Sequence, residues 1–70
     1  MKKQENDLPA ALSNAEKTVR SGVWDLHMSF FEDHQITVIG LCRHLRGLGY
    51  AFRRAASHEY PFLMYVLRTP

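Results

Sequence analysis

The chain of 70 residues has a single cysteine, Cys42, and no long apolar run. A lone thiol cannot form an intrachain disulfide, and an unpaired cysteine is typical of proteins kept in a reducing compartment. No segment approaches the roughly 20 apolar residues that cross a bilayer, and the polar start lacks the apolar stretch of a signal peptide. The sequence therefore predicts a cytoplasmic protein that does not span a membrane.

Excess charge is also scarce, because the formal net charge is only +2, but the charge is unevenly distributed. Five of the nine lysines and arginines lie in residues 43–70, where the only acidic residue is Glu59. They are Arg43, Arg46, Arg53, Arg54 and Arg68. This asymmetry is compatible with an acidic partner. A chain this short forms a marginal core, so we also expect a homodimer.

The sequence lacks a pattern typical of catalysis or metal binding. None of its four histidines shares a helix face with a cysteine or carboxylate at ligand spacing, whereas a structural zinc site needs four ligands. A nucleophilic cysteine must be exposed and lie beside a base, but the helical phase of Cys42 places it in the predicted core. We therefore expect no metal, no cofactor and no enzymatic activity.

The periodicity predicts a disordered N-terminus over residues 1–7 and a single small α+β domain over residues 8–70. Apolar residues at helical spacing indicate a first helix that begins after an Asp7 N-cap and ends near Ser21 and Gly22. Residues 23–31 alternate between apolar and polar, which is typical of a half-buried strand. The inward residues of this strand would be Trp24, Leu26, Met28 and Phe30.

A second helix is predicted over residues 33–48, with Asp33 as N-cap and Gly49 as the left-handed residue that ends it. Its buried face would carry Val38, Leu41, Cys42, Leu45 and Leu48. The opposite face would carry Ile36, Gly40 and Gly47, a stripe for close helix packing or dimer contact. Because glycine lowers helix stability, the stripe either serves such packing or has no specific role.

Residues 50–55 and 62–68 indicate two further strands joined by a turn. A strand–helix–strand–strand order with a right-handed crossover leaves a gap that the last strand fills. The predicted fold is thus a half-ferredoxin-like unit, an antiparallel three-stranded sheet in the order 1-3-2 with one packed helix and an additional N-terminal helix. The central strand would direct Phe62, Met64 and Val66 inward.

Alternation directs five residues to the sheet face opposite the packed helix. They are His27, Arg53, Leu63, Tyr65 and Leu67. Arginine beside tyrosine is enriched at binding hot spots, so this face is the predicted surface for a protein partner. The alternative is a small module that binds or cleaves RNA, in which Arg53, Arg54 and His58 would be the key residues.

Residues 23–69 resemble the RraB family of protein inhibitors of ribonuclease E. The similarity rests on the Trp24-Asp25-Leu26 strand, the acidic Phe31-Glu32-Asp33 start of a helix, the sequence LRGLGY that closes this helix, and a final strand. The resemblance implies a non-catalytic cytoplasmic protein that binds and regulates a larger partner, such as an RNA-processing enzyme. A phage-encoded or bacterial inhibitor of a host protein would have the same features.

Overall fold

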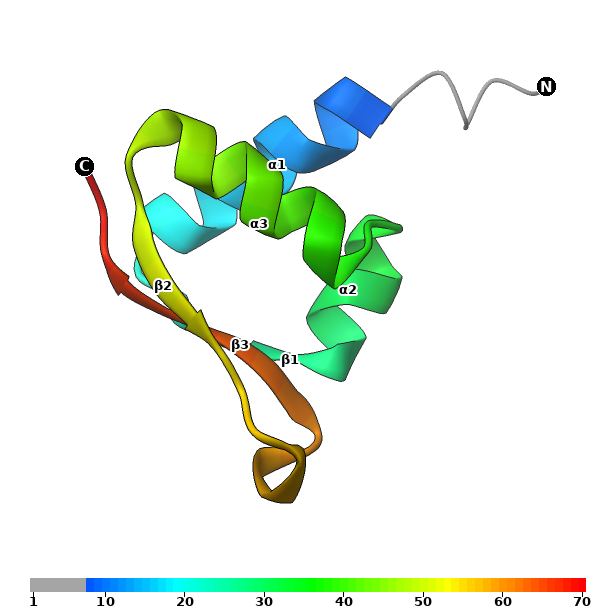
Figure 1. Ribbon diagram of the computed structural model, residues 1–70. Helices are drawn as coiled ribbons and strands as arrows, with labels where there is room; N and C mark the ends of the chain where they lie inside the picture. Colours follow the sequence, from blue (N-terminus) through cyan, green and yellow to red (C-terminus); the bar gives the residue numbers. More distant parts are fainter. Residues whose placement is uncertain (1–7) are drawn as a thin grey trace, which may run out of the picture.

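The computed structural model describes residues 8–70, and Figure 1 shows how their helices and strands are arranged. The helices are α1 (Leu8–Arg20), α2 (Met28–His34), α3 (Val38–Leu48) and the short 3-10 helix η2 (Ser57–Glu59). The strands are β1 (Asp25–His27), β2 (Ala51–Arg54) and β3 (Phe62–Arg68). The predictions of a disordered segment over residues 1–7 and of an Asp7 N-cap lie outside the described residues.

The three strands form one antiparallel sheet in the order β1-β3-β2. The predicted α+β class and the predicted 1-3-2 order are confirmed. The α-helices lie together on one side of the sheet, and α1 packs against α2 and α3 (Figure 1). Residues 8–70 therefore leave the other side of the sheet uncovered. No helix within this range is both long and apolar enough to cross a membrane.

The predicted strand over residues 23–31 is wrong beyond its centre, because only Asp25–His27 are extended and the chain turns helical at Met28. The His27 side chain caps α2 by accepting a hydrogen bond from the Ser29 N–H at 3.1 Å. Helical spacing then buries Phe31 and leaves Phe30 only partly buried. Trp24, predicted to be inward, is 46% exposed.

The predicted helix over residues 33–48 is in fact two helices separated by a short break. Gln35 adopts the left-handed conformation, with φ of 57°, and its N–H bonds back to the last turn of α2. Thr37, and not Asp33, is the N-cap of α3, since its hydroxyl accepts the Gly40 N–H at 2.9 Å. The predicted end at Gly49 is confirmed, because this residue has φ of 93°.

The break between α2 and α3 also changes the predicted glycine stripe. Ile36 is not on an exposed face, since it lies between the helices and is 7% exposed within the core. At Gly40 an added Cβ would lie 2.9 Å from the capping hydroxyl of Thr37. The glycine at position 40 is therefore explained by the cap of its own helix. Gly47 is exposed, and an added side chain there would meet open space.

Strand β3 departs from simple alternation at two places. Leu26 pairs with Met64 but His27 pairs with Phe62, so Leu63 is an extra residue opposite β1. The same happens opposite β2, where Ala51 pairs with Arg68, Phe52 pairs with Val66, and Leu67 is extra. An extra residue of this kind shifts the side chains that follow to the other face of the sheet.

The core lies between the sheet and the helices. Its fully buried side chains come from every layer and include Val19, Leu26, Leu41, Leu45 and Met64. Cys42 belongs to this core, with its thiol 3.8 Å from the Met64 sulfur, and burial raises the pKa of this thiol. The inward orientation predicted for Cys42 is confirmed.

A polar cluster anchors α1 to the start of β2. The Tyr50 hydroxyl donates a hydrogen bond to the Glu16 carboxylate, and Arg20 binds the same carboxylate oxygen at 2.8 Å. The bond from Tyr50 is the main reason why the pKa of Glu16 is lowered. Burial, together with this carboxylate, raises the pKa of Tyr50. The N-terminal helix is thus bound to the helical layer and does not cover the open side of the sheet.

Candidate binding face on the sheet

The uncovered side of the sheet carries a continuous row of aromatic and charged side chains. We call it the outer sheet face and define it by His27, Phe62, Tyr65, Arg53 and Glu59. The His27 and Phe62 rings meet edge to face with centroids 5.4 Å apart, and the Phe62 and Tyr65 rings stack at 6.0 Å. The Arg53 guanidinium lies over the Tyr65 ring at 4.6 Å. All three strands and the turn after β2 thus contribute to one surface.

Pairing in the sheet explains why these side chains meet. Arg53 lies directly opposite Tyr65 in the ladder of β2 and β3, and directly opposite residues share a face. His27 lies opposite Phe62 in the ladder of β1 and β3. The Leu63 bulge then places Phe62 on the same side as Tyr65, although simple alternation would separate them.

The charge on this face is neutralised locally. Arg53 donates two parallel hydrogen bonds to the Glu59 carboxylate, each 3.0 Å long. The Ala56 N–H donates a third bond, at 2.7 Å, to the same carboxylate. These contacts, first the one with Arg53, lower the pKa of Glu59 to about 2. The Arg53–Glu59 pair therefore adds a cation and an anion to the surface but no net charge.

The structure brings together three of the five predicted contact residues. His27, Arg53 and Tyr65 lie on the outer sheet face as predicted. Leu63 does not, because the bulge directs it to the core, where it packs with the helices. Leu67 is 57% exposed near the end of β3.

Sequence reasoning missed two members of the face. Phe62 was expected inside but is exposed on the outer sheet face, because the bulge that redirects it leaves no mark in a strand apolar on both sides. Glu59 lies in η2, a one-turn helix inside the predicted turn, and reaches back to Arg53. The only signal in the sequence was that Glu59 is the single acid among five basic residues.

The residues of the RNA alternative are spread over different surroundings. Arg54 pairs with Met64 and so lies on the helix side of β2, whereas Arg53 lies on the outer sheet face. His58 is exposed in η2, and no side-chain hydrogen bond to it is present within residues 8–70. The three residues therefore do not form one constellation like that of a nuclease site.

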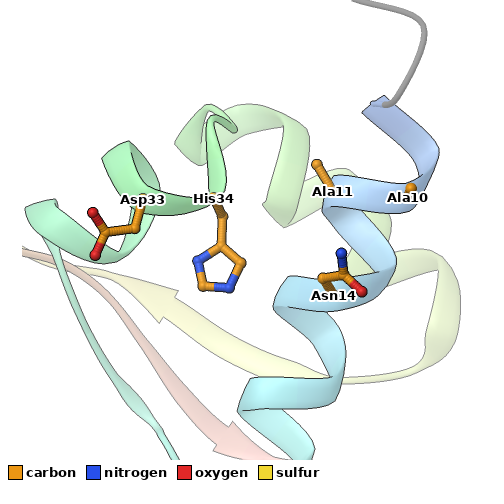
Figure 2. Close-up of a pocket in the computed structure, with 5 residues that line it drawn as sticks. All are labelled: Ala10, Ala11, Asn14, Asp33 and His34. Carbon is orange, nitrogen blue, oxygen red and sulfur yellow. The ribbon is translucent and has the colours of Figure 1, made fainter. Parts of the chain in front are cut away.

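Two of the hollows formed by residues 8–70 lie on the helical side. One, of about 370 Å³, lies between α1 and α2 and is lined by Ala10, Ala11, Asn14, Asp33 and His34 (Figure 2). The His34 Nδ1 is 2.9 Å from the Phe30 carbonyl oxygen. The Asp33 carboxylate points away from this ring, as Figure 2 shows, so the adjacent acid and histidine do not form a catalytic pair.

The other hollow, of about 420 Å³, is mainly apolar and lies between α2, α3 and β3. Its apolar lining includes Met28, Phe31, Ile36 and Leu63. Neither hollow contains a metal-binding cluster, and residues 8–70 as a whole bring no three histidine, cysteine or carboxylate side chains together for a metal ion.

Comparisons with known proteins identified no relative of this chain. The resemblance of residues 23–69 to the RraB family stays a prediction based on the residues alone. A search of protein-family models, a search of curated proteins and a search of solved structures each found no match to the chain.

Proposed function

We propose that this protein is a non-catalytic regulator that binds a larger protein partner through the outer sheet face. One observation carries the proposal: aromatic rings from β1 and β3 and the Arg53 guanidinium from β2 lie in one row on a side of the sheet that residues 8–70 leave uncovered. Aromatic residues and arginine are enriched in the centres of protein interfaces.

The pairing of charges favours a protein over a nucleic acid on this face. Nucleic acids are bound chiefly through cations that contact phosphates. Arg53 is the cation at the centre of the outer sheet face, and two of its donors already bind Glu59. A phosphate would have to compete with this carboxylate, whereas a protein surface can pack over the neutral pair.

As part of the same proposal, we interpret β1, the helical crossover, β2 and β3 as half of a ferredoxin-like unit. The central position of β3, antiparallel to both neighbours, supports this interpretation. In such a unit one face of the sheet packs on helices and the other stays available for contact.

Site-specific photo-crosslinking in cells tests the proposal. A photoreactive phenylalanine analogue replaces Phe62 on the outer sheet face, or Ile39, which is 58% exposed on α3, as the matched control. We expect a discrete adduct with a larger protein only from position 62, and we expect Tyr65→Ala to abolish it. Equal adducts from both positions, or an adduct that ribonuclease removes, would contradict the proposal.

The mass of the adduct separates the remaining outcomes. An adduct of twice the 8.1 kDa chain would identify a second copy as the occupant of the face. This result would support the predicted homodimer and contradict a larger partner. An adduct of greater mass identifies the partner directly by peptide sequencing.

A further inference from the structure

The free edge of β2 offers a second binding surface, distinct from the outer sheet face. Strand β2 is at the border of the sheet, since the order is β1-β3-β2. An edge strand presents unpaired backbone groups that an extended chain can bind. In β2, the backbone groups of Phe52 and Arg54 are the ones that the hydrogen-bond pattern leaves unpaired.

Alternation along the ladder identifies these positions. The Ala55 N–H donates to the Leu63 carbonyl at 3.1 Å, which makes these residues a hydrogen-bonded pair. In an antiparallel ladder every second pair is of this kind, so Arg53 and Tyr65 form the next one. The backbone groups of Phe52 and Arg54 therefore point away from β3, to the outside of the sheet. In agreement, the Arg54 carbonyl accepts a long 3.4 Å contact from the Arg53 side chain.

Cationic side chains flank this edge on the helix side. Arg54 and Phe52 share that side because both lie opposite buried residues of β3. The Arg46 guanidinium of α3 lies 5.4 Å from the centre of the Phe52 ring. Both arginines are exposed, and within residues 8–70 neither forms an ion pair, whereas Arg20 and Arg53 do.

We propose that the β2 edge binds an extended segment of a partner protein in which acidic and apolar residues alternate. The segment would add a strand beside β2, with its acidic side chains toward Arg46 and Arg54. Its apolar side chains would then continue the outer sheet face beyond Tyr65 and Arg53. Successive side chains of a strand point to opposite faces, so an alternating sequence meets both requirements at once.

A second copy of the chain is the less suitable occupant. Pairing of two β2 edges would bring Arg46 and Arg54, which form no ion pair within residues 8–70, close to the same arginines of the other copy. Like charges directly opposite each other in a sheet are unfavourable. An acidic segment, by contrast, is attracted by the same arginines, and this attraction weakens as salt is added.

Backbone amide exchange measured by NMR tests the proposal with a short capped peptide in which glutamate and valine alternate. We expect slower exchange at the Phe52 and Arg54 amides and no change at the Arg53 amide, which is already bonded to Tyr65. A peptide with lysine in place of glutamate should bind at least about tenfold more weakly. Protection that appears only along β1, or no binding of the acidic peptide at millimolar concentration, would overturn the proposal.

Matched variants separate the edge from general charge attraction. Arg54→Glu and Arg46→Glu should each lower the affinity for the acidic peptide by about tenfold or more. Lys17→Glu, which makes the same charge change on an exposed site of α1, should leave its affinity within about twofold. Equal losses in all three variants would show only long-range attraction and would overturn the proposal.

Two further probes test the backbone pairing and the partner class. An acidic peptide methylated on alternate backbone nitrogens cannot donate to β2, so we expect its binding to be lost. Undiminished binding of this peptide, or equally tight binding of a uridine oligonucleotide, would overturn the proposal. The proposal is independent of the outer sheet face, because Tyr65→Ala should abolish the Phe62 crosslink while the Phe52 and Arg54 amides keep their protection.

Discussion

Single side chains divide sharply between those that hold the fold and those that face solvent. Leu45 is fully buried on α3, whereas Ile39 on the same helix is 58% exposed. We expect Leu45→Ala to lower the free energy of unfolding by about 2–5 kcal/mol, because it leaves a cavity in a small core. Ile39→Ala should cost less than about 0.5 kcal/mol. Urea denaturation of both variants checks this, and similar midpoints would contradict the helical phase.

The ion pair on the outer sheet face makes stability depend on pH. The pKa of Glu59 is about 2 in the folded protein, compared with 4.5 for an unperturbed glutamate. A lowered pKa stabilises the folded protein above pH 4.5, and this stabilisation is lost as the pH falls toward 2. We expect Glu59→Gln to reduce the fall in Tm between pH 5 and pH 2.

Glu16 has to be separated from Glu59 in that experiment, because the pKa of Glu16 is lowered as well. The effect of Glu59→Gln on the fall in Tm between pH 5 and pH 2 therefore has to be measured twice. It is measured once in the wild type and once in the Glu16→Gln background. The Glu59 contribution should also shrink in high salt, since the pair is partly exposed. If Glu59→Gln left the fall in Tm between pH 5 and pH 2 unchanged, the Arg53–Glu59 ion pair would not stabilise the fold.

At the level of elements, the break between α2 and α3 decides which residue caps the longer helix. Thr37 is the N-cap in the structure, whereas the sequence pattern favoured Asp33. We expect Thr37→Ala to cost about 1 kcal/mol, because the Gly40 N–H loses its partner. Asp33→Ala is the control and should be close to neutral. Thermal unfolding of the two variants distinguishes two separate helices from one continuous helix. With one continuous helix, Asp33→Ala would lower Tm more than Thr37→Ala does.

Bulges in β3 show why an element can be predicted correctly while its faces are not. The bounds of this strand agree with the sequence pattern, as does its central place in the sheet. The directions of Phe62 and Leu63 were wrong, because a single extra residue opposite β1 exchanges them. A strand that is apolar on both faces has no polar residue to mark such a shift.

For the molecule as a whole, α1 has to be attached to the rest of the chain because its Ala15 and Val19 side chains are part of the core. Tyr50 reaches from the start of β2 to Glu16 on α1, so one hydrogen bond joins distant parts of the chain. We expect Tyr50→Phe to lower the free energy of unfolding by about 1 kcal/mol. The difference in ultraviolet titration between the wild type and Tyr50→Phe should also show that Tyr50 titrates above its usual pKa. No loss of stability in Tyr50→Phe would mean that apolar packing alone holds α1.

The sequence by itself determined the class of fold, the order of the strands and several element ends. Periodicity identified α1 and the second half of the long helical segment, and glycine marked the end of α3 at Gly49. The ends of the helices depend on contacts between residues close in the chain, so local patterns suffice for them, and the order of the strands follows from the rule for crossover connections. Alternation likewise placed Arg53 and Tyr65 on one face and Cys42 was placed inside by helical phase.

Only the tertiary structure decided where the first strand stops, where the helix breaks and which residues complete the outer sheet face. Residues 28–31 alternate like a strand and are also spaced for a helix, and packing of Phe31 into the core selects the helix. Phe62 and Glu59 join His27, Tyr65 and Arg53 through pairing between separate strands and the turn between β2 and β3. Such contacts depend on register, which one extra residue can shift, and no local pattern in this chain records it.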